Sequence, residues 1–347
     1  MPTGYPAQAG QRDKTRVGGL PPARRYGDAA QPTRPTQYSM NTTPTTEDRI
    51  WAILAHLSAL SFGMGILLPV VGWSDQRRKS NYASFQCLQA LGYQSVGFTV
   101  WALSYLLIVI LGSIVLLATF QPDQPPGATL SPGLIVFLII VFSGFAVYFL
   151  FPIIAAIACA LGRDYRYPLL GDRLARYLDF SSSPKQEGQA WLDEEHEFRW
   201  VAAMGHFSIL IIIWGMLAPL TAWMLQGKNS VLLKFQSIQT LVYQALATLV
   251  YFAGSFLYLV GILLLVAGMG ALGGTDFNSS TGIVGIVILG IFLLISAVLI
   301  LSVPLLHILG QWAGYRVLKG DDYRYPVIGR LVQKWSSKHS TLEERSS

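Results

Sequence analysis

Long apolar stretches with almost no charged residue constrain this chain more than any other feature of its sequence. Six of them are about 20 residues or longer, enough for a helix to span the hydrocarbon core of a bilayer. They lie near residues 50–73, 96–119, 133–161, 198–225, 245–269 and 283–309. Charged residues make up 13% of the chain, against about 25% in a typical soluble domain. The sequence therefore predicts an all-α, polytopic integral membrane protein.

The chain also contains two tandem copies of one unit. The sequence YRYP closes each copy, at residues 165–168 and again at 323–326. Upstream of it, eight pairs of residues match at a constant offset of 150 positions (206 − 56 and 244 − 94). These pairs are His56 and His206, Pro69 and Pro219, Trp73 and Trp223, Phe85 and Phe235, Gln86 and Gln236, Gln89 and Gln239, Tyr93 and Tyr243, and Gln94 and Gln244. A gapless match over this span indicates an internal duplication.

Composition divides the chain into five parts. Residues 1–46 are basic and rich in Pro and Gly, and we expect this tail to be disordered because it has few apolar residues to bury. Residues 47–180 form membrane repeat 1, 181–196 a linker and 197–335 membrane repeat 2. Residues 336–347 form a polar C-terminal tail.

The basic residues indicate how each copy crosses the membrane. The loops 121–133 and 270–282 contain no Lys or Arg, whereas the other segments between apolar stretches are basic. If the first apolar segment of each copy dips into the bilayer and returns, every Lys and Arg lies on the cytoplasmic face. The Gly and Pro residues in these segments suit such a hairpin.

We therefore predict two parallel repeats of three apolar helical segments each, with four full crossings and two dipping segments. Both termini are then cytoplasmic, and the expected location is a prokaryotic plasma membrane. The alternative is six full crossings, because residues 198–225 are long enough to span the bilayer.

We interpret the YRYP motifs as anchors at the inner membrane surface. Their tyrosines would belong to an aromatic belt, their arginines would reach lipid phosphates, and their prolines would begin amphipathic helices lying in the membrane plane. The anchor residues are Tyr165, Arg166, Tyr167, Pro168, Tyr323, Arg324, Tyr325 and Pro326. The first predicted partner is thus the bilayer with its anionic headgroups, and membrane proteins are further candidate partners.

Two other sets of polar residues interrupt the apolar segments. His56 and His206 are paired by the duplication, either as neutral histidines bonded to a helix-terminal carbonyl or as functional groups. The second set forms one stripe on a helix face in each copy. These stripes are Gln86, Gln89 and Tyr93, and Gln236, Gln239 and Tyr243. We expect them to join the two repeats through buried amides, with the lining of a polar cavity as the alternative.

No pattern typical of catalysis occurs in the sequence. It contains no HExxH, nucleophile elbow or phosphate-binding loop, and Asp and Glu are nearly absent from the apolar stretches. We predict a non-enzymatic protein with no catalytic residue, cofactor or metal site. The net charge of +6 is better explained by membrane orientation than by nucleic acid, which we exclude as a partner. The oligomeric state is left open.

Each copy resembles the prokaryotic membrane domain of unknown function forty-eight-seventy. That domain is related to the Tic-twenty-like family, a protein-import component of the chloroplast inner envelope. The resemblance rests on the openings HLSAL and GHFSI, on FQxxQxxxYQ and on YRYP, and it covers residues 48–178 and 197–332. It implies an α-helical integral membrane protein. We expect a scaffold or partner-binding membrane module, with a conduit or insertase-like component in translocation as the alternative.

Overall fold

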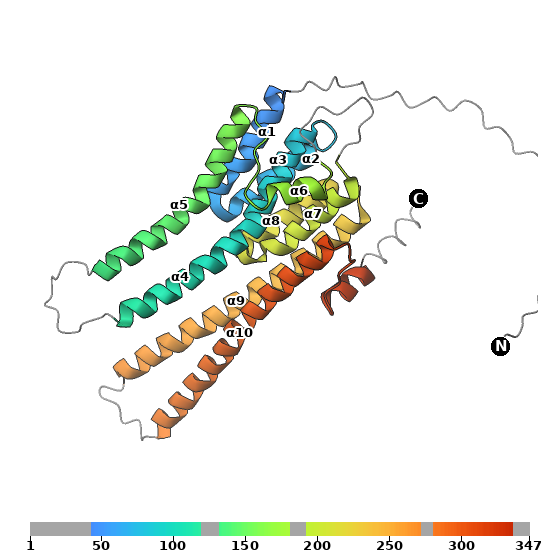
Figure 1. The fold of residues 1–347 in the computed structure, drawn as a ribbon. Helices are drawn as coiled ribbons and strands as arrows, with labels where there is room; N and C mark the ends of the chain where they lie inside the picture. Colours follow the sequence, from blue (N-terminus) through green and yellow to red (C-terminus); the bar gives the residue numbers. More distant parts are fainter. Residues whose placement is uncertain (1–42, 119–131, 181–191, 272–279, 336–347) are drawn as a thin grey trace, which may run out of the picture. The chain divides into compact units, whose positions relative to one another are not determined.

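Helices account for most of the residues that the structure, a computed structural model, describes (Figure 1). The described residues are 43–118, 132–180, 192–271 and 280–335, and no β-strand occurs among them. The predicted all-α class is confirmed. The predictions for the two tails, for most of the linker and for most of both loops that lack Lys and Arg fall outside the described residues.

The two repeats contain the same elements in the same order. Repeat 1 comprises α1 (Thr46–Leu57), η1 (Ser58–Ile66), α2 (Leu67–Gln76), α3 (Asn81–Gly92), η2 (Tyr93–Gly97), α4 (Phe98–Ala118), α5 (Pro132–Ala160) and α6 (Gly171–Tyr177). Repeat 2 comprises α7 (Glu194–Phe207), η3 (Ser208–Met216), α8 (Leu217–Gln226), α9 (Val231–Ala271) and α10 (Ser280–Leu318). The helix α9 runs without a break where repeat 1 has α3, the π-helical turn η2 and α4. The predicted duplication is therefore visible in the fold as two similar halves.

The first apolar segment of each repeat folds back on itself. A straight helix of 31 residues, the length of Thr46–Gln76, would hold its ends about 45 Å apart. Instead, Nε2 of Gln76 donates a hydrogen bond of 3.1 Å to Oε1 of Glu47. In repeat 2, the guanidinium of Arg77 contacts both Glu194 at the start of α7 and Gln226 at the end of α8. Both segments are thus helical hairpins.

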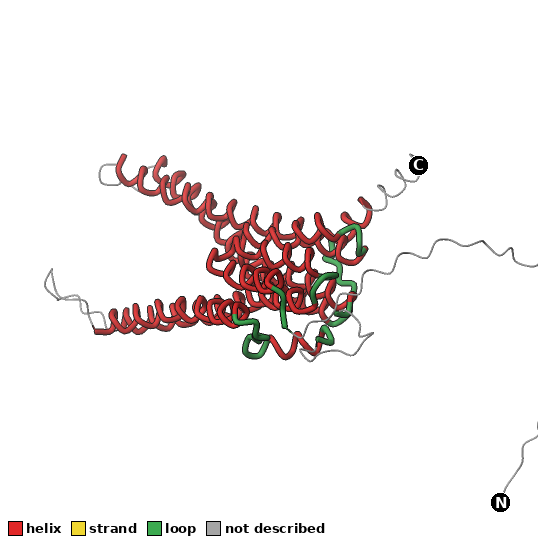
Figure 2. The backbone as a smooth tube through the Cα atoms, turned by 90° about the horizontal axis from the view of Figure 1, so that it is seen from above, coloured by secondary structure: helices red, strands yellow, loops and turns green. Residues whose placement is uncertain are grey.

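The predicted reversal of the first apolar segment is therefore present in both repeats. By length and composition alone, six helical segments among the described residues qualify as membrane spans. Two of the six, Thr46–Gln76 and Glu194–Gln226, are the hairpins. The other four belong to the pairs α4 with α5 and α9 with α10, which Figures 1 and 2 show side by side. Along these four helices large apolar side chains are exposed, as expected for a surface that faces lipid.

Two features of the backbone make the reversals feasible. Phe62 and Ile212, at equivalent positions, both have φ of 53° with strongly negative ψ, a conformation that residues other than glycine rarely adopt. Three residues later, Gly65 and Gly215 allow the chain to pass close to the preceding turn. A Cβ at Gly215 would lie 2.1 Å from the carbonyl oxygen of Ser208. The glycines that interrupt the apolar pattern are therefore required by the turn.

The hairpin also needs polar partners for its backbone, because a buried polar group without a hydrogen bond is costly. In repeat 1, Nε2 of Gln94 donates to the carbonyl oxygen of Ala55 at 3.2 Å and to Oγ of Ser58 at 2.9 Å. In repeat 2, Gln244 makes the equivalent bonds to Gly205 and Ser208. A matched glutamine of the neighbouring helix therefore satisfies the polar groups at each reversal.

We expect Gly215→Ala to lower the free energy of unfolding by about 1–3 kcal/mol, because the new methyl group forces the turn apart. Gly290→Ala is the matched control, since a Cβ at Gly290 on α10 meets nothing within 4 Å. Thermal unfolding in mild detergent, followed by tryptophan fluorescence, measures the difference. Equal melting temperatures for the two variants would contradict a close approach at Gly215.

Candidate functional site

Each repeat contains a buried cluster of hydrogen-bonded polar side chains, which we call the His–Gln–Tyr cluster. Its members are His56, Gln86, Gln89 and Tyr167 in repeat 1, and His206, Gln236, Gln239 and Tyr325 in repeat 2. The histidine comes from the hairpin, the glutamines from α3 or α9, and the tyrosine from the YRYP segment that follows the last long helix. Three separate parts of each repeat therefore meet at this cluster.

The partners of the histidine fix its protonation pattern. Nε2 of His56 lies 3.0 Å from Oε1 of Gln86, and Nδ1 lies 3.0 Å from the hydroxyl of Tyr167. Because an amide oxygen only accepts, Nε2 carries the proton and donates it to Gln86. Nδ1 of the neutral ring then accepts from the tyrosine hydroxyl. Burial raises the pKa of Tyr167 well above its ordinary value, so the hydroxyl keeps the proton that it donates.

The two glutamines bind the YRYP segment. Nε2 of Gln86 donates to Oδ1 of Asp164 at 2.9 Å and to the carbonyl oxygen of Tyr165 at 3.2 Å. Gln89 donates to the same carbonyl at 2.9 Å and accepts from the backbone N–H of Tyr167 at 2.9 Å. Partial burial raises the pKa of Asp164, an effect that the nearby Arg166 opposes. The Asp164 carboxylate, the Tyr165 carbonyl and the Tyr167 N–H are therefore each bonded to a glutamine of α3.

Aromatic stacking extends the cluster towards the long helices. The ring of Tyr93 stacks on Tyr167 with centroids 4.3 Å apart, and its hydroxyl donates to the carbonyl oxygen of Tyr148 on α5. In repeat 2, Tyr243 stacks on Tyr325 at 3.9 Å and donates to Leu306 on α10. The stacked pairs thus connect the cluster to the last long helix of each repeat, which is α5 in repeat 1 and α10 in repeat 2.

Repeat 2 reproduces the hydrogen bonds of repeat 1. His206 contacts Tyr325 at 3.0 Å and Gln236 at 3.1 Å. Gln236 donates to Oδ1 of Asp322 at 3.1 Å, and Gln239 accepts from the backbone N–H of Tyr325 at 3.4 Å. In both repeats the partners of the histidine are side chains, and not the helix-terminal carbonyl that the neutral interpretation expected.

The predicted place of the glutamine stripes needs correction. We expected Gln86, Gln89 and Tyr93, with their counterparts Gln236, Gln239 and Tyr243, to join the two repeats. In the structure their hydrogen bonds to described residues stay within their own repeat. The helix α3 packs on α1 and α2, and α9 packs on α7 and α8. The YRYP segment offers backbone groups that satisfy the buried amides, so no second repeat is needed.

The YRYP interpretation is also corrected in part. Tyr167 and Tyr325 are buried in the cluster, so they do not belong to an aromatic belt. Nor do Pro168 and Pro326 begin helices, since α6 starts at Gly171 and the helix after Pro326 covers residues 328–335. In repeat 1 the reason is a turn after the proline, in which Leu169 has φ of 65°.

The outer residues of the motif have polar partners. Arg166 bonds to Asp164 and Asp172, and Arg324 bonds to Asp322 and Gln333. The first tyrosines, Tyr165 and Tyr323, are only partly exposed and pack edge-on against the second tyrosines. These contacts fix the conformation of each segment.

The two repeats meet instead around Arg77. Its side chain is 5% exposed and contacts Glu194 at 3.0 Å and Glu197 at 3.3 Å. It also donates to Oε1 of Gln226 at 3.1 Å, and its guanidinium lies 4.2 Å from the ring centroid of Phe198. Here α2 packs against α8. One buried cation of repeat 1 therefore holds both ends of the hairpin of repeat 2.

Sequence analysis did not single out Arg77, although the duplication contains a signal. At the offset of 150, Glu197 matches Glu47, but Arg77 matches Gly227. Arg77 is thus a charged residue without a counterpart in the other copy, and only one copy can make its contacts. In this protein those contacts form the junction of the two repeats.

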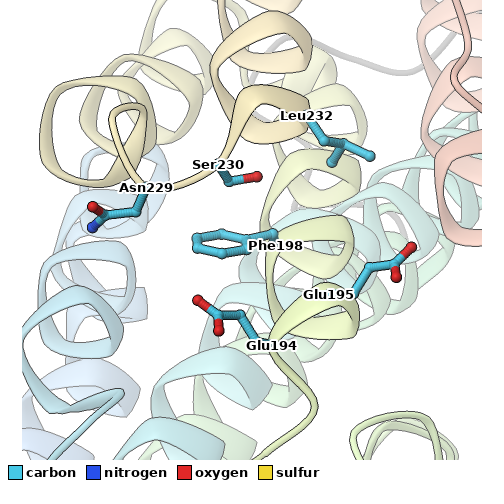
Figure 3. Close-up of a pocket in the computed structure, with 6 residues that line it drawn as sticks. All are labelled: Glu194, Glu195, Phe198, Asn229, Ser230 and Leu232. Atoms are coloured by element: carbon cyan, nitrogen blue, oxygen red, sulfur yellow. The ribbon is translucent and has the colours of Figure 1, made fainter. Parts of the chain in front are cut away.

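A pocket opens beside this junction (Figure 3). Glu194, Glu195 and Phe198 of α7 line one side, and Asn229, Ser230 and Leu232 line the other. Glu194 already pairs with Arg77 and Arg78, and Glu195 pairs with Arg199. Within the described ranges, no three His, Cys, Asp or Glu side chains gather closely enough to hold a metal ion.

We expect Tyr167→Phe to reduce stability by about 1–3 kcal/mol, because it leaves Nδ1 of His56 buried without its donor. Tyr165→Phe is the matched control, since Tyr165 is partly exposed and contributes its backbone carbonyl to the cluster. Denaturation in detergent measures the free energy of unfolding of the two variants. The same loss for both would show that the tyrosine hydroxyl does not hold the hairpin.

Arg77→Ala should cost about 3–5 kcal/mol, because it leaves the buried carboxylate of Glu197 without its cation. The control is Lys79→Ala, which removes an exposed pair with Asp75 and should cost at most about 1 kcal/mol. Melting temperatures of the purified full-length variants test this. An Arg77→Ala variant as stable as Lys79→Ala would exclude a structural role for the junction.

Comparison with known proteins places the duplicated unit in a family. A family model described as the magnetosome magnetite crystal formation protein family matches residues 47–174 and, separately, residues 197–332. These two ranges coincide with the two repeats. No curated protein and no solved structure matches the chain. The chain therefore belongs to the magnetosome magnetite crystal formation protein family, with one family unit in each of its repeats.

Proposed function

We propose that this protein is a non-enzymatic scaffold of the magnetosome membrane that supports magnetite crystal formation. The family description supplies the process, and the apolar helices supply the location in a membrane. The sequence on its own pointed to a prokaryotic plasma membrane. Family membership favours the magnetosome membrane instead.

The scaffold proposal rests on the observation that the buried polar residues hold parts of the protein together. In both His–Gln–Tyr clusters they fix one helical segment against another. At the junction, Arg77 fixes one repeat against the other. Such an arrangement yields a rigid membrane unit whose apolar outer surfaces and basic cytoplasmic segments are available to lipids and to membrane protein partners.

The alternative function is a conduit or insertase-like component, to which the resemblance to the Tic-twenty-like family points. That function needs a polar space between the repeats, and the glutamine stripes were the residues expected to line it. Because Gln86, Gln89, Gln236 and Gln239 are buried and bonded within their own repeats, the geometry favours the scaffold.

Complementation tests the scaffold. In a magnetite-forming bacterium that lacks its own member of the family, we expect the wild-type chain and the Lys79→Ala variant to restore crystal size. The Arg77→Ala variant should restore it less, because its repeats are no longer held together. Electron microscopy measures the crystals, and immunoblots of the magnetosome membrane fraction show whether each protein is present. Wild-type protein in that fraction with crystals still at the size of the deletion strain would contradict the proposal.

The proposed orientation places both termini and the basic segments in the cytoplasm. In intact cells that hold the protein in the plasma membrane, cysteines introduced at Ala128 and Ser279 should react with a membrane-impermeant maleimide. Cysteines at Lys79 and Asn229 should react only after the cells are opened, because they lie at the cytoplasmic ends of the hairpins. The native Cys87 and Cys159 are buried and give little background. Labelling of position 79 from outside would establish a full crossing by the first segment.

A further inference from the structure

The helix 328–335, which follows the second YRYP motif, has apolar residues on two faces. Ile328 and Val332 point into the protein and are 8% and 5% exposed. Val327, Leu331 and Trp335 are 62%, 60% and 47% exposed. Val327 directly precedes the helix, and its carbonyl oxygen accepts from the N–H of Leu331 at 3.2 Å. Because residues four apart share a helix face, these three form one apolar stripe on the outside, which we call the outer stripe. An exposed apolar stripe on a short helix indicates a surface that is covered by something else.

Basic side chains flank the outer stripe. Arg324 lies over the ring of Phe235, with its guanidinium 5.4 Å from the centroid, and it shares its charge with Asp322. Arg330 bonds through Nε to the carbonyl oxygen of Pro326. This bond leaves the Nη groups of an exposed side chain available to an anion. An apolar face bordered by arginines is typical of helices that lie in a membrane interface.

Repeat 1 does not present the same surface. At the offset of 158 set by the YRYP motifs (323 − 165), the outer stripe corresponds to Leu169, Arg173 and Tyr177. A cation therefore replaces the central Leu331. The ring of Tyr177 is engaged by His196, at a centroid distance of 4.5 Å. Only the second of the two equivalent segments thus carries a continuous outer stripe.

The position of the helix identifies what covers the stripe. It follows α10, one of the four long helices with lipid-exposed side chains, by ten residues (328 − 318). Near the end of α10, Trp312 and Tyr315 are both largely exposed. Exposed Trp and Tyr mark the level at which a membrane helix leaves the hydrocarbon. The helix 328–335 therefore begins close to the membrane surface.

We propose that the outer stripe docks onto the bilayer itself, with Val327 and Leu331 between the headgroups and acyl chains and Arg330 against anionic phosphates. The docked helix would fix the height and tilt of repeat 2 in the membrane, whereas repeat 1 would lack this contact. The inference requires that the chain is embedded in a membrane. It does not require a role in crystal formation. A negative result for docking would therefore not contradict the proposed function, and a negative result for the proposed function would not contradict docking.

Spin labels on the full-length protein test the docking. Cys87→Ser and Cys159→Val, which introduce the residues found at the equivalent positions of repeat 2, provide the background without cysteines. One label is placed at position 331 and, as the matched control, another at position 173. The protein is reconstituted into vesicles of phosphatidylcholine with phosphatidylglycerol. We expect the label at 331 to be relaxed mainly by oxygen, which concentrates in lipid, and the label at 173 mainly by a water-soluble nickel complex.

A second comparison measures the contribution of the positive charge of Arg330 to docking. Replacing Arg330 by Gln should lower the ratio of docked to undocked label at 331 about fivefold, the factor that corresponds to about 1 kcal/mol for one arginine at an anionic surface. Vesicles of phosphatidylcholine alone should remove most of this difference. Equal nickel accessibility at positions 331 and 173 would overturn the proposal. So would spectral broadening at 331 that disappears on dilution with unlabelled protein, because it would identify a second copy as the partner.

Discussion

The structure depends on one constraint, which is that a buried backbone that reverses its direction must find polar partners within the protein. Each hairpin turns at a residue with positive φ, Phe62 or Ile212, where the helical backbone is interrupted. Gln94 and Gln244 bind the carbonyl and hydroxyl groups at the reversal. The His–Gln–Tyr clusters then attach each hairpin to α3 or α9 and to the YRYP segment. The YRYP motif is repeated because each hairpin needs this contact.

The same constraint explains which residues the two copies share and which they do not. The residues of the His–Gln–Tyr clusters are matched in both repeats, because the polar groups of each hairpin need hydrogen-bond partners within their own repeat. Arg77 has no counterpart, and it lies where one copy meets the other. A buried cation paired with Glu197 is costly to desolvate and strongly destabilising when broken. It therefore specifies a particular junction of the repeats more than it adds general stability.

The sequence was sufficient for the helical class, the duplication and the reversal of the first apolar segment in each copy, because span length, fixed offsets and the positions of Gly, Pro, Lys and Arg are local signals. It was not sufficient for the partners of Gln86 and Gln236. A helical pattern shows that these residues share a face, but it does not show which segment covers that face. Here the cover is a non-helical stretch after a long helix, whose course has no periodicity to reveal it. The burial of Tyr167 and Tyr325 was missed for the same reason.

Duplication within one chain lets the two copies keep a common frame and differ in their outer contacts. Because matched residues form the hydrogen bonds that hold each hairpin, positions outside the clusters can diverge without loss of the fold. Arg77 opposite Gly227 makes the junction directional, since a guanidinium from repeat 1 holds the hairpin of repeat 2 and the part of the chain that the structure describes has no reciprocal guanidinium contact. Leu331 in place of Arg173 makes the segment after the second YRYP more apolar than the first. A symmetric pair of identical subunits could hold neither difference, because each change would appear in both halves. The tandem arrangement therefore gives a membrane protein two distinguishable repeats, the first of which supplies the buried cation of the junction while the second presents the more apolar outer segment.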